Sequence, residues 1–267
     1  IPEMREYIAP YYNSVNRTDE SVGKTLQALD EAGLRDNTMV IFLSDHGMGV
    51  IGAKWTCYPY GTQTPIIIRW PGEVSPGQVD STHLVSAIDL LPTILEAADL
   101  EVPDQTDGMS LLPLLEREPS VDWRDYVYTC FNHMNAPDYI PMRSVISDDF
   151  IYVWNPWRHD RDEVPNTLGA NGKAIDIMLN SGVPEYAERV EFLRSRPVEE
   201  FYDIKNDPGC WNNLIKDSSK GEILQEHRKA SYEVMKSTDD PELERYPGGG
   251  VVLIQAQGNP GEESIVE

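Results

Sequence analysis

The chain has 267 residues, with 22 Lys and Arg against 45 Asp and Glu, which gives a formal charge of −23 at pH 7. That balance argues against nucleic acid and anionic lipid surfaces as partners, because both carry negative charge. Apolar residues make up 40% of the chain, enough to bury a core, and no apolar run approaches the roughly 20 residues of a membrane span. Three cysteines are too few and too scattered for a disulfide framework or a thiolate metal cage (Cys57, Cys130 and Cys210).

The first part of the chain predicts helices that alternate with strands. Residues 14–34 place apolar side chains on one face of a helix (Val15, Val22, Leu26 and Leu29). The apolar run TMVIFLS at 38–44 is too short for a helix and predicts a strand buried on both faces, as in a parallel sheet. PIIIRW at 65–70 predicts a second strand, and a helix follows from Asp89, whose side chain can cap its first turn. This order predicts the α/β class.

A different pattern begins after a stretch rich in Pro, Asp and Glu at 99–125. This stretch is the candidate boundary between two parts, which we place at 1–117 and 118–267. Beyond it, short alternating segments predict a small antiparallel sheet with a hairpin loop at Ser147, Asp148 and Asp149. The predicted strands lie at 126–131, 142–147, 150–154 and 200–204.

The remainder of the second part predicts one helix packed on that sheet. Ser219 and Glu222 form a capping-box pattern before a helix that ends near Thr238. The polar stretch 155–197 contains Trp and Arg but predicts no regular element. The tail from Tyr246 is expected to wrap around the protein or to fray.

Asp45 and His46 directly follow the first predicted strand. In open α/β sheets, ligands bind at the carboxyl ends of strands. An aspartate and a histidine there offer a hard oxygen and an imidazole to a divalent cation, and Gly47 allows the backbone to turn sharply. The other interpretation is an Asp that caps a turn and a His that bonds to a loop carbonyl, and the dipeptide alone favours it.

Several other side chains are candidates for ligand contacts. Lys54, in the loop GAKWT, can bind an anionic oxygen near a metal, although an isolated lysine is more often solvated. His133 and Arg143 can face a pocket and contact an anionic or hydroxylated ligand, or act as structural hydrogen-bonding residues. An aromatic and basic cluster can form a glycan-binding surface, or a loop anchored by tryptophan (Trp154, Trp157, Arg158, His159 and Arg161).

Taken in order, these segments resemble the C-terminal portion of the type I sulfatases, in the alkaline phosphatase superfamily. The resemblance covers about residues 5–241. It rests on YYNSV at 11–15, NTMVIFLSDHG at 37–47, AKWT at 53–56, TPIIIRWPG at 64–72, IDLLPT at 88–93 and DGMSLL at 107–112. The later sequences look most like the heparan N-sulfatase (sulfamidase) branch: YIPMRSV at 139–145, EFYDIKNDP at 200–208 and STDDP at 237–241.

The resemblance implies the C-terminal part of a catalytic α/β sulfatase domain at 1–117, and a smaller α+β domain with a tail at 118–267. It implies a calcium site with Asp45 and His46 among the ligands, and manganese or zinc as the alternative metals. By the same resemblance, Lys54 looks like a contact for a sulfate oxygen. We expect His133 and Arg143 to line the substrate side of the cleft.

Members of this family use a formylglycine, whose hydrated diol attacks the sulfate sulfur of the substrate. That residue, in the sequence Cys-x-Pro-Ser-Arg, belongs to the family's N-terminal half. Cys57 begins a similar sequence, but Tyr60 and Gly61 replace Ser and Arg, so we interpret Cys57 as structural. Because the chain begins at Ile1, inside what looks like the middle of a sequence, we expect a piece that is inactive alone and has the N-terminal half as its partner.

Three hypotheses therefore stay open. The chain is part of a sulfatase for a sulfated sugar or glycan, part of a metal-dependent phosphodiester or phosphonate hydrolase of the same superfamily, or a glycan-binding fragment without catalysis. The residues upstream of Ile1 would discriminate among them. The resemblance implies a periplasmic, secreted or lysosomal location. The sequence leaves open the substrate, the choice between N- and O-sulfate, and the oligomeric state.

Overall fold

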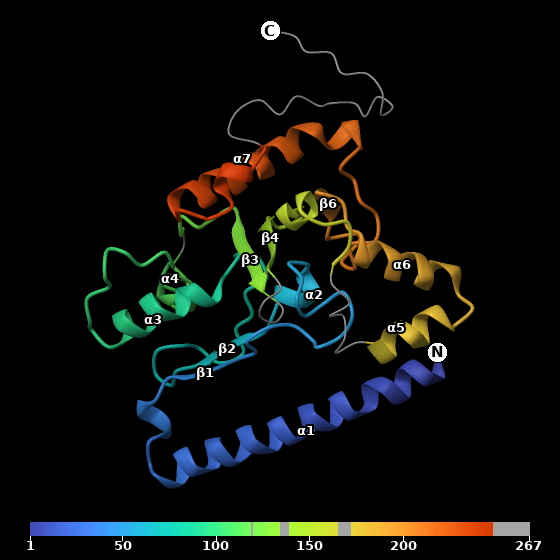
Figure 1. Ribbon diagram of the computed structural model, residues 1–267. Coiled ribbons are helices and arrows are strands. Elements are labelled where there is room, and N and C mark those ends of the chain that lie inside the picture. Colours follow the sequence, from blue (N-terminus) through green and yellow to red (C-terminus); the bar gives the residue numbers. More distant parts are fainter. Residues whose placement is uncertain (119, 134–138, 165–171, 248–267) are drawn as a thin grey trace, which may run out of the picture.

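The structure is a computed structural model that describes residues 1–118, 120–133, 139–164 and 172–247 (Figure 1). Strands β1 (Val40–Leu43) and β2 (Ile66–Arg69) form one sheet. A four-stranded sheet has the order β3 (Val127–His133), β4 (Tyr139–Ile146), β5 (Phe150–Trp154) and β6 (Glu199–Asp203). The helices are α1 (Pro2–Glu31), α2 (Pro59–Thr62), α3 (Leu90–Ala97), α4 (Leu112–Leu115), α5 (Gly172–Leu179), α6 (Pro184–Arg194) and α7 (Gly221–Ser237).

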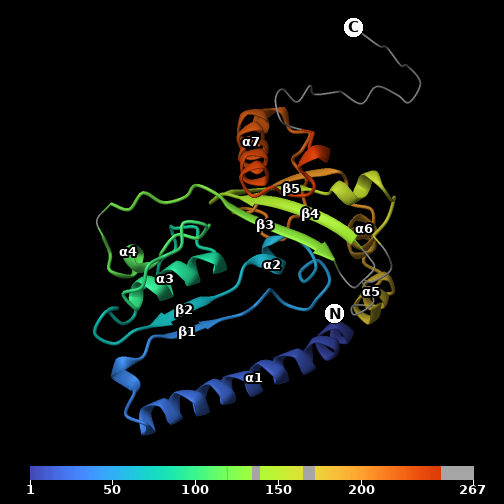
Figure 2. The same cartoon turned by 60° about the vertical axis from the view of Figure 1, so that its left-hand side comes forward.

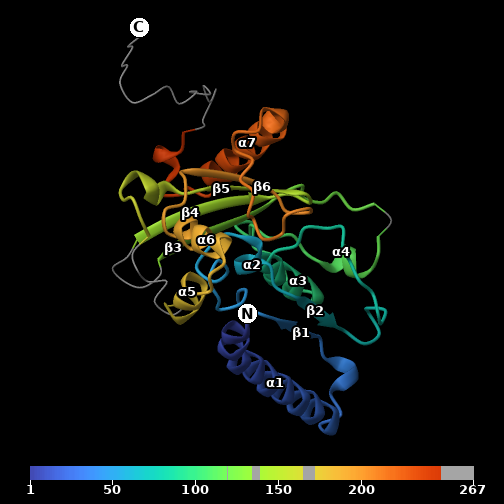
Figure 3. The same cartoon turned by 90° about the vertical axis from the view of Figure 1, so that its right-hand side faces the viewer.

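The elements lie in layers. Helix α7 covers one face of the four-stranded sheet, whereas α2 and α6 lie under the opposite face (Figures 2 and 3). The β1–β2 pair lies below α2, α3 lies beside α2, and α1 runs along the outer side (Figure 1). No helix in the described part of the chain is both long enough and apolar enough to cross a membrane.

Both strands predicted in the first part are present, but the parallel pairing is wrong. β1 and β2 are antiparallel, with Ile41 opposite Ile68. They are also not buried on both faces, since Ile67 is 58% exposed and Phe42 is exposed as well. A continuous apolar run indicates two covered faces, yet the described residues leave the face with Phe42 and Ile67 exposed.

The predicted antiparallel sheet is confirmed, and it carries the core of the second part. The turn after β4 is closed by a hydrogen bond from Ser147 N to Phe150 O of 2.9 Å. Alternate residues of β5 face opposite sides of the sheet. Ile151 and Val153 pack with the cluster under α6, while Tyr152 and Trp154 pack against α7, and all four are fully buried.

Two predicted helix caps are wrong in detail. Ser219 and Glu222 do not form a capping box; instead the Asp217 carboxylate accepts a hydrogen bond from Ser219 N. Asp89 does not cap α3 itself, but its side chain forms a capping box with Ser86 on the 3-10 turn 87–89 that leads into α3. The buried carboxylate of Asp89 accepts hydrogen bonds from two backbone N–H groups, those of Ser86 (2.7 Å) and of Met109, 20 positions along the chain.

Arg124 completes the environment of Asp89. Its guanidinium forms a bidentate ion pair with the Asp89 carboxylate, with a distance of 2.9 Å from Nη1 to Oδ2. This pair links α3 to the segment that enters β3. The boundary between 117 and 118 stays a prediction, and the ion pair crosses it. The tail beyond Pro247 lies outside the described residues.

Candidate functional site

Asp45 and His46 leave the C-terminal end of β1 side by side. The Asp45 carboxylate is 83% exposed, and its Oδ2 atom lies 3.4 Å from His46 Nε2. His46 Nδ1 lies 2.7 Å from the Gly47 carbonyl oxygen, a contact that favours the tautomer with hydrogen on Nδ1. Nε2 then keeps its lone pair next to the carboxylate. The bond to a loop carbonyl, which the sequence offered as an alternative to a metal site, therefore coexists with two available ligand atoms.

Gly47 is required by close packing rather than by a sharp turn. Its N–H donates to Gly61 O at 2.9 Å, and a Cβ atom at position 47 would lie 1.8 Å from the carbonyl oxygen of Tyr60. Gly61 is equally confined, because a Cβ there would lie 2.3 Å from the carbonyl oxygen of Ala53. The backbone after β1 thus packs directly on α2, and neither position has room for a side chain.

Lys54 lies in the loop between β1 and α2, and this loop folds back onto the segment that follows His46. The Lys54 backbone N–H donates to Met48 O at 3.0 Å, two residues beyond His46. The side chain is half-buried, and its Nζ atom lies 5.6 Å from the centroid of the Trp55 ring. Trp55 has a φ of 67°, a left-handed conformation that a non-glycine residue seldom adopts. The loop is thus held in a specific shape around a lysine.

The end of this loop is fixed to the four-stranded sheet. Ser144 Oγ of β4 donates to the Cys57 carbonyl oxygen at 3.4 Å, and the Tyr58 hydroxyl donates to Glu200 Oε2 of β6 at 2.5 Å. Cys57 is buried, and burial raises the pKa of its thiol to about 12. A buried thiol that stays protonated suits the structural interpretation of Cys57 and not a nucleophile.

His133 and Arg143 occupy different environments. His133 is exposed at the end of β3, with its ring centroid 5.0 Å from that of Tyr139. Arg143 is only 1% exposed and forms a bidentate ion pair with Asp240, with distances of 2.7 and 3.0 Å. It also donates to oxygens of three neighbouring residues (Phe131, Asn132 and Met142). A substrate contact by Arg143 would require the pair with Asp240 to open.

The aromatic and basic cluster is not a glycan-binding surface. Trp154 and Trp157 are fully buried, so their ring faces are unavailable to a sugar. Arg158 is held by Asp162 at 2.7 Å and by a backbone oxygen. The alternative interpretation, a loop anchored by tryptophan, is confirmed. The sequence pattern shows that these residue types are close together but not which of them enter the core.

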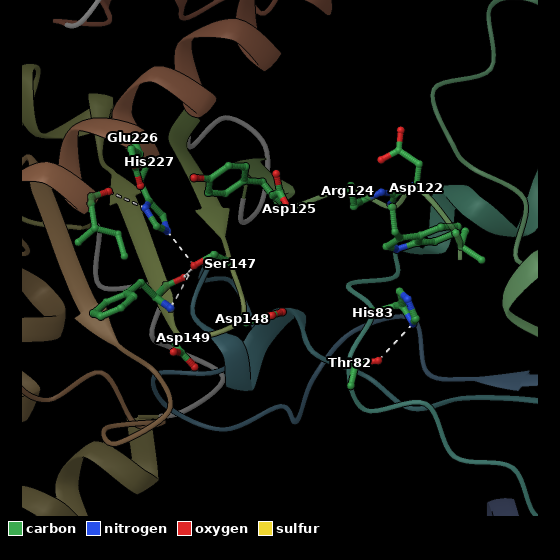
Figure 4. A pocket seen from close by; sticks show the side chains of 15 residues that line it. Thr82, His83, Asp122, Arg124, Asp125, Ser147, Asp148, Asp149, Glu226 and His227 are labelled. Carbon is green, nitrogen blue, oxygen red and sulfur yellow. Dashed lines mark hydrogen bonds between the residues drawn. The ribbon is translucent and has the colours of Figure 1, made fainter. Parts of the chain in front are cut away.

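A cavity of about 540 Å³ lies elsewhere, between the hairpin after β4, α7 and the segment before β3 (Figure 4). Figure 4 shows His227 and Ser147 on one wall and His83 on the other. Its lining carries an excess of acidic side chains (Asp122, Asp125, Asp148, Asp149 and Glu226). Negative charge of this density repels a sulfate group, so this cavity does not suit the sulfate of the predicted substrate.

The donor atoms at Asp45 and His46 fit a divalent cation, but they form only part of a coordination shell. A carboxylate oxygen and an imidazole nitrogen face one another there, and calcium takes about six to eight ligands. Across the residues that the structure describes, no group of three or more His, Cys, Asp or Glu side chains is arranged to hold a metal ion. The remaining ligands would have to come from other protein segments or from water.

Comparison with known proteins identifies the family. The family model "Sulfatase" matches residues 2–100, and the model "N-sulphoglucosamine sulphohydrolase, C-terminal" matches residues 52–155. The two matches overlap at residues 52–100, together cover residues 2–155, and agree with the fold. The chain belongs to the sulfatase family.

Individual sulfatases resemble the chain over most of its length. It is 28% identical to an ulvan-active sulfatase of Formosa agariphila, covering 95% of this chain and 48% of that protein. It is 31% identical to human N-sulphoglucosamine sulphohydrolase, covering 90% of this chain and 50% of the relative. A solved 2-O GAG sulfatase superposes with a TM-score of 0.68 at 25% identity, over 88% of this chain and 44% of its own. The chain thus spans about half the length of these sulfatases, and it has their α/β fold.

Sequence reasoning missed Tyr58 and Glu200, which join the site loop to the sheet of the second part. The signal was present in EFYDI at 200–204. Strand alternation places Glu200 on the same face as Tyr202, and that face is buried. A carboxylate on a core-facing position requires hydrogen-bond donors, so a partner was to be expected.

Proposed function

We propose that the complete protein containing this chain hydrolyses the sulfate ester or N-sulfate of a sulfated sugar or glycan. The observation that carries this proposal is the single loop that presents Asp45, His46 and Lys54 after β1. The relatives support it, because their names refer to ulvan and to N-sulphoglucosamine as the compounds acted upon. An amine and two metal-ligating groups on one short loop suit an anionic substrate in an otherwise acidic protein.

In this proposal each residue has a separate task. Asp45 and His46 hold a calcium ion, and the bound cation supplies positive charge that offsets the charge of the sulfate group. Lys54 binds a sulfate oxygen and stabilises the charge that develops on the group during transfer. His133 is a candidate contact for the rest of the substrate, and Arg143 is one only when its ion pair opens.

We infer that the nucleophile, a formylglycine, belongs to a part of the protein outside this chain. Cys57 is buried and lacks the following Ser and Arg, so it does not replace that residue. An apolar surface on β2 and around α3 supports packing against the N-terminal half of the fold (Ile67, Ile88, Leu91, Ile94 and Leu100 are all exposed). The chain alone is therefore expected to be inactive. The proposal includes an exported location, in the periplasm, the medium or the lysosome.

The test is a comparison of variants in the complete protein with calcium present. Lys54→Ala should lower turnover of a sulfated substrate by about 100-fold, as expected when a contact to the transferring group is removed. Lys205→Ala is the matched control, because Lys205 pairs with Asp149 on the surface and should leave turnover unchanged.

The same preparation should also be assayed on phosphate and phosphonate esters, and its metal content measured. Faster turnover of a phosphorus ester with bound manganese or zinc would favour the superfamily's phosphohydrolases over a sulfatase. Full activity in Lys54→Ala would remove the assigned role of that residue.

A further inference from the structure

Glu200 is a fully buried carboxylate to which the proposed reaction assigns no task. It is 0% exposed, and within the described residues no Lys, Arg or His forms an ion pair with it. Three neutral groups donate hydrogen bonds to it instead. The hydroxyls of Tyr58 and Tyr202 both reach Oε2, at 2.5 and 2.6 Å, and Asn155 Nδ2 reaches Oε1 at 2.6 Å. Bonds of this kind offset the cost of burying the carboxylate.

The three donors differ in where they come from. Tyr202 lies on the same strand as Glu200, and Asn155 directly follows the neighbouring strand β5, so both belong to the second part of the chain. Tyr58 lies 142 positions away from Glu200 and belongs to the loop that carries Lys54. Among these donors, Tyr58 alone joins the sheet to the candidate site.

A continuous set of hydrogen bonds connects Tyr58 to the neighbour of Lys54. Tyr58 N donates to Thr56 Oγ1 at 3.3 Å, and Thr56 Oγ1 donates to the carbonyl oxygen of Ala53 at 2.7 Å. Thr56 and Ala53 are both buried, so water does not compete for these bonds. Tyr58 is therefore connected, through its backbone N–H and the Thr56 hydroxyl, to the residue that precedes Lys54.

Two buried arginines hold the Tyr58 ring. The guanidinium groups of Arg189 and Arg196 each lie 5.7 Å from its centroid, within the range of a cation–π contact. Arg189 is itself fixed by the carbonyl oxygens of Cys210 (2.7 Å) and Gly209 (2.9 Å). Both the hydroxyl and the ring of Tyr58 thus contact the second part of the chain.

We propose that Tyr58 and Glu200 are positioning residues for the sulfatase reaction: their hydrogen bond sets the place of Lys54 relative to Asp45 and His46. This inference rests on the proposed function. Neither residue touches the substrate; both act through the loop. Displacing a charge by about 1 Å at a transferring group can lower the rate by about 100-fold, so a hydroxyl distant from the reaction can matter.

The test compares Tyr58→Phe with Tyr202→Phe in the complete protein. Each change removes one buried hydroxyl that donates to the same oxygen of Glu200, so both should lower the midpoint of urea unfolding by similar amounts. Only Tyr58→Phe removes a bond between the loop and the sheet. It should lower kcat for a sulfated substrate about tenfold or more with little change in KM, whereas Tyr202→Phe should keep kcat within about twofold of the wild type.

Amide hydrogen exchange gives a readout that does not depend on activity. The N–H groups of residues 53–58 should exchange faster in Tyr58→Phe and at the wild-type rate in Tyr202→Phe. If the wild type hydrolyses no sulfate, the proposed function fails, and the exchange rates alone decide whether Tyr58 holds the loop. The positioning role is overturned if exchange is unchanged in Tyr58→Phe, if its kcat stays at the wild-type value, or if Tyr202→Phe loses as much kcat.

Discussion

The Arg143–Asp240 ion pair provides a direct test of how the second part of the chain is stabilised. The two side chains are 1% and 7% exposed, and two hydrogen bonds join them. In Arg143→Ala, the Asp240 carboxylate stays buried without its cation. Breaking a buried pair in this way costs about 3–5 kcal/mol, against a total stability of about 5–15 kcal/mol for a domain. The variant should therefore lose a large share of its stability.

The assay is urea unfolding at pH 7, with Arg35→Ala as the control. Arg35 forms a comparable ion pair with Asp30 at 2.8 Å, but both side chains are exposed, so its loss should cost less than about 1 kcal/mol. The double variant with Asp240→Ala should be more stable than Arg143→Ala alone, because no unpaired buried charge remains. A loss below about 1 kcal/mol in Arg143→Ala would refute the structural assignment and restore Arg143 as a candidate for substrate binding.

The pH dependence of this loss has a defined sign. Burial alone would raise the pKa of Asp240, but hydrogen bonds, mainly from Arg143, lower it below the ordinary value. The stabilisation is therefore complete above the pKa of about 3.9 of an unfolded Asp, and it disappears as the pH falls through the lower folded pKa. The stability difference between wild type and Arg143→Ala should shrink over that acidic range.

Two further predictions concern the loop of the site. Gly47→Ala should destabilise the protein and abolish activity, because the added Cβ atom would lie 1.8 Å from Tyr60 O. Gly49→Ala is the control: a Cβ atom there has no neighbouring atom within 4 Å, so the variant should be tolerated in the same thermal unfolding and turnover assays. Cys130 should react with a thiol reagent in the native protein, whereas Cys57 should react only after unfolding, because Cys57 is buried and its pKa is raised to about 12. Mass spectrometry of the labelled peptides distinguishes the two cysteines, and rapid labelling of Cys57 in the native protein would contradict its burial.

The local elements could largely be predicted, because periodicity depends on residues that are close in sequence. Alternation located the strands of the antiparallel sheet, and the run at 38–44 located β1. The pairing of β1 could not be predicted, since a continuous apolar run is the same for parallel and antiparallel neighbours. Helix α6 was missed because its buried face includes Arg189, a charged residue at a position where the helical pattern expects an apolar one.

The candidate site could be predicted only in part. The dipeptide Asp45-His46 indicated metal ligands, Lys54 was a candidate contact for an anionic oxygen, and the family resemblance implied a role for each. Contacts between distant segments have no counterpart in local patterns, so the ion pair of Arg143 with Asp240 and the bond of Tyr58 to Glu200 became visible only in the fold. The same limit explains why the two tryptophans near 155 gave no indication of their burial.

The separation of 142 positions between Tyr58 and Glu200 also bears on how the protein is made. A ribosome adds about 5–20 residues per second, so Glu200 follows Tyr58 after about 7–28 s. During that interval the segment with Asp45 and Lys54 has left the ribosome, but the sheet that anchors it does not yet exist. The site loop of the nascent chain must therefore remain without its bond to Glu200 while the later strands are synthesised. A chaperone that shields this loop would act during this period.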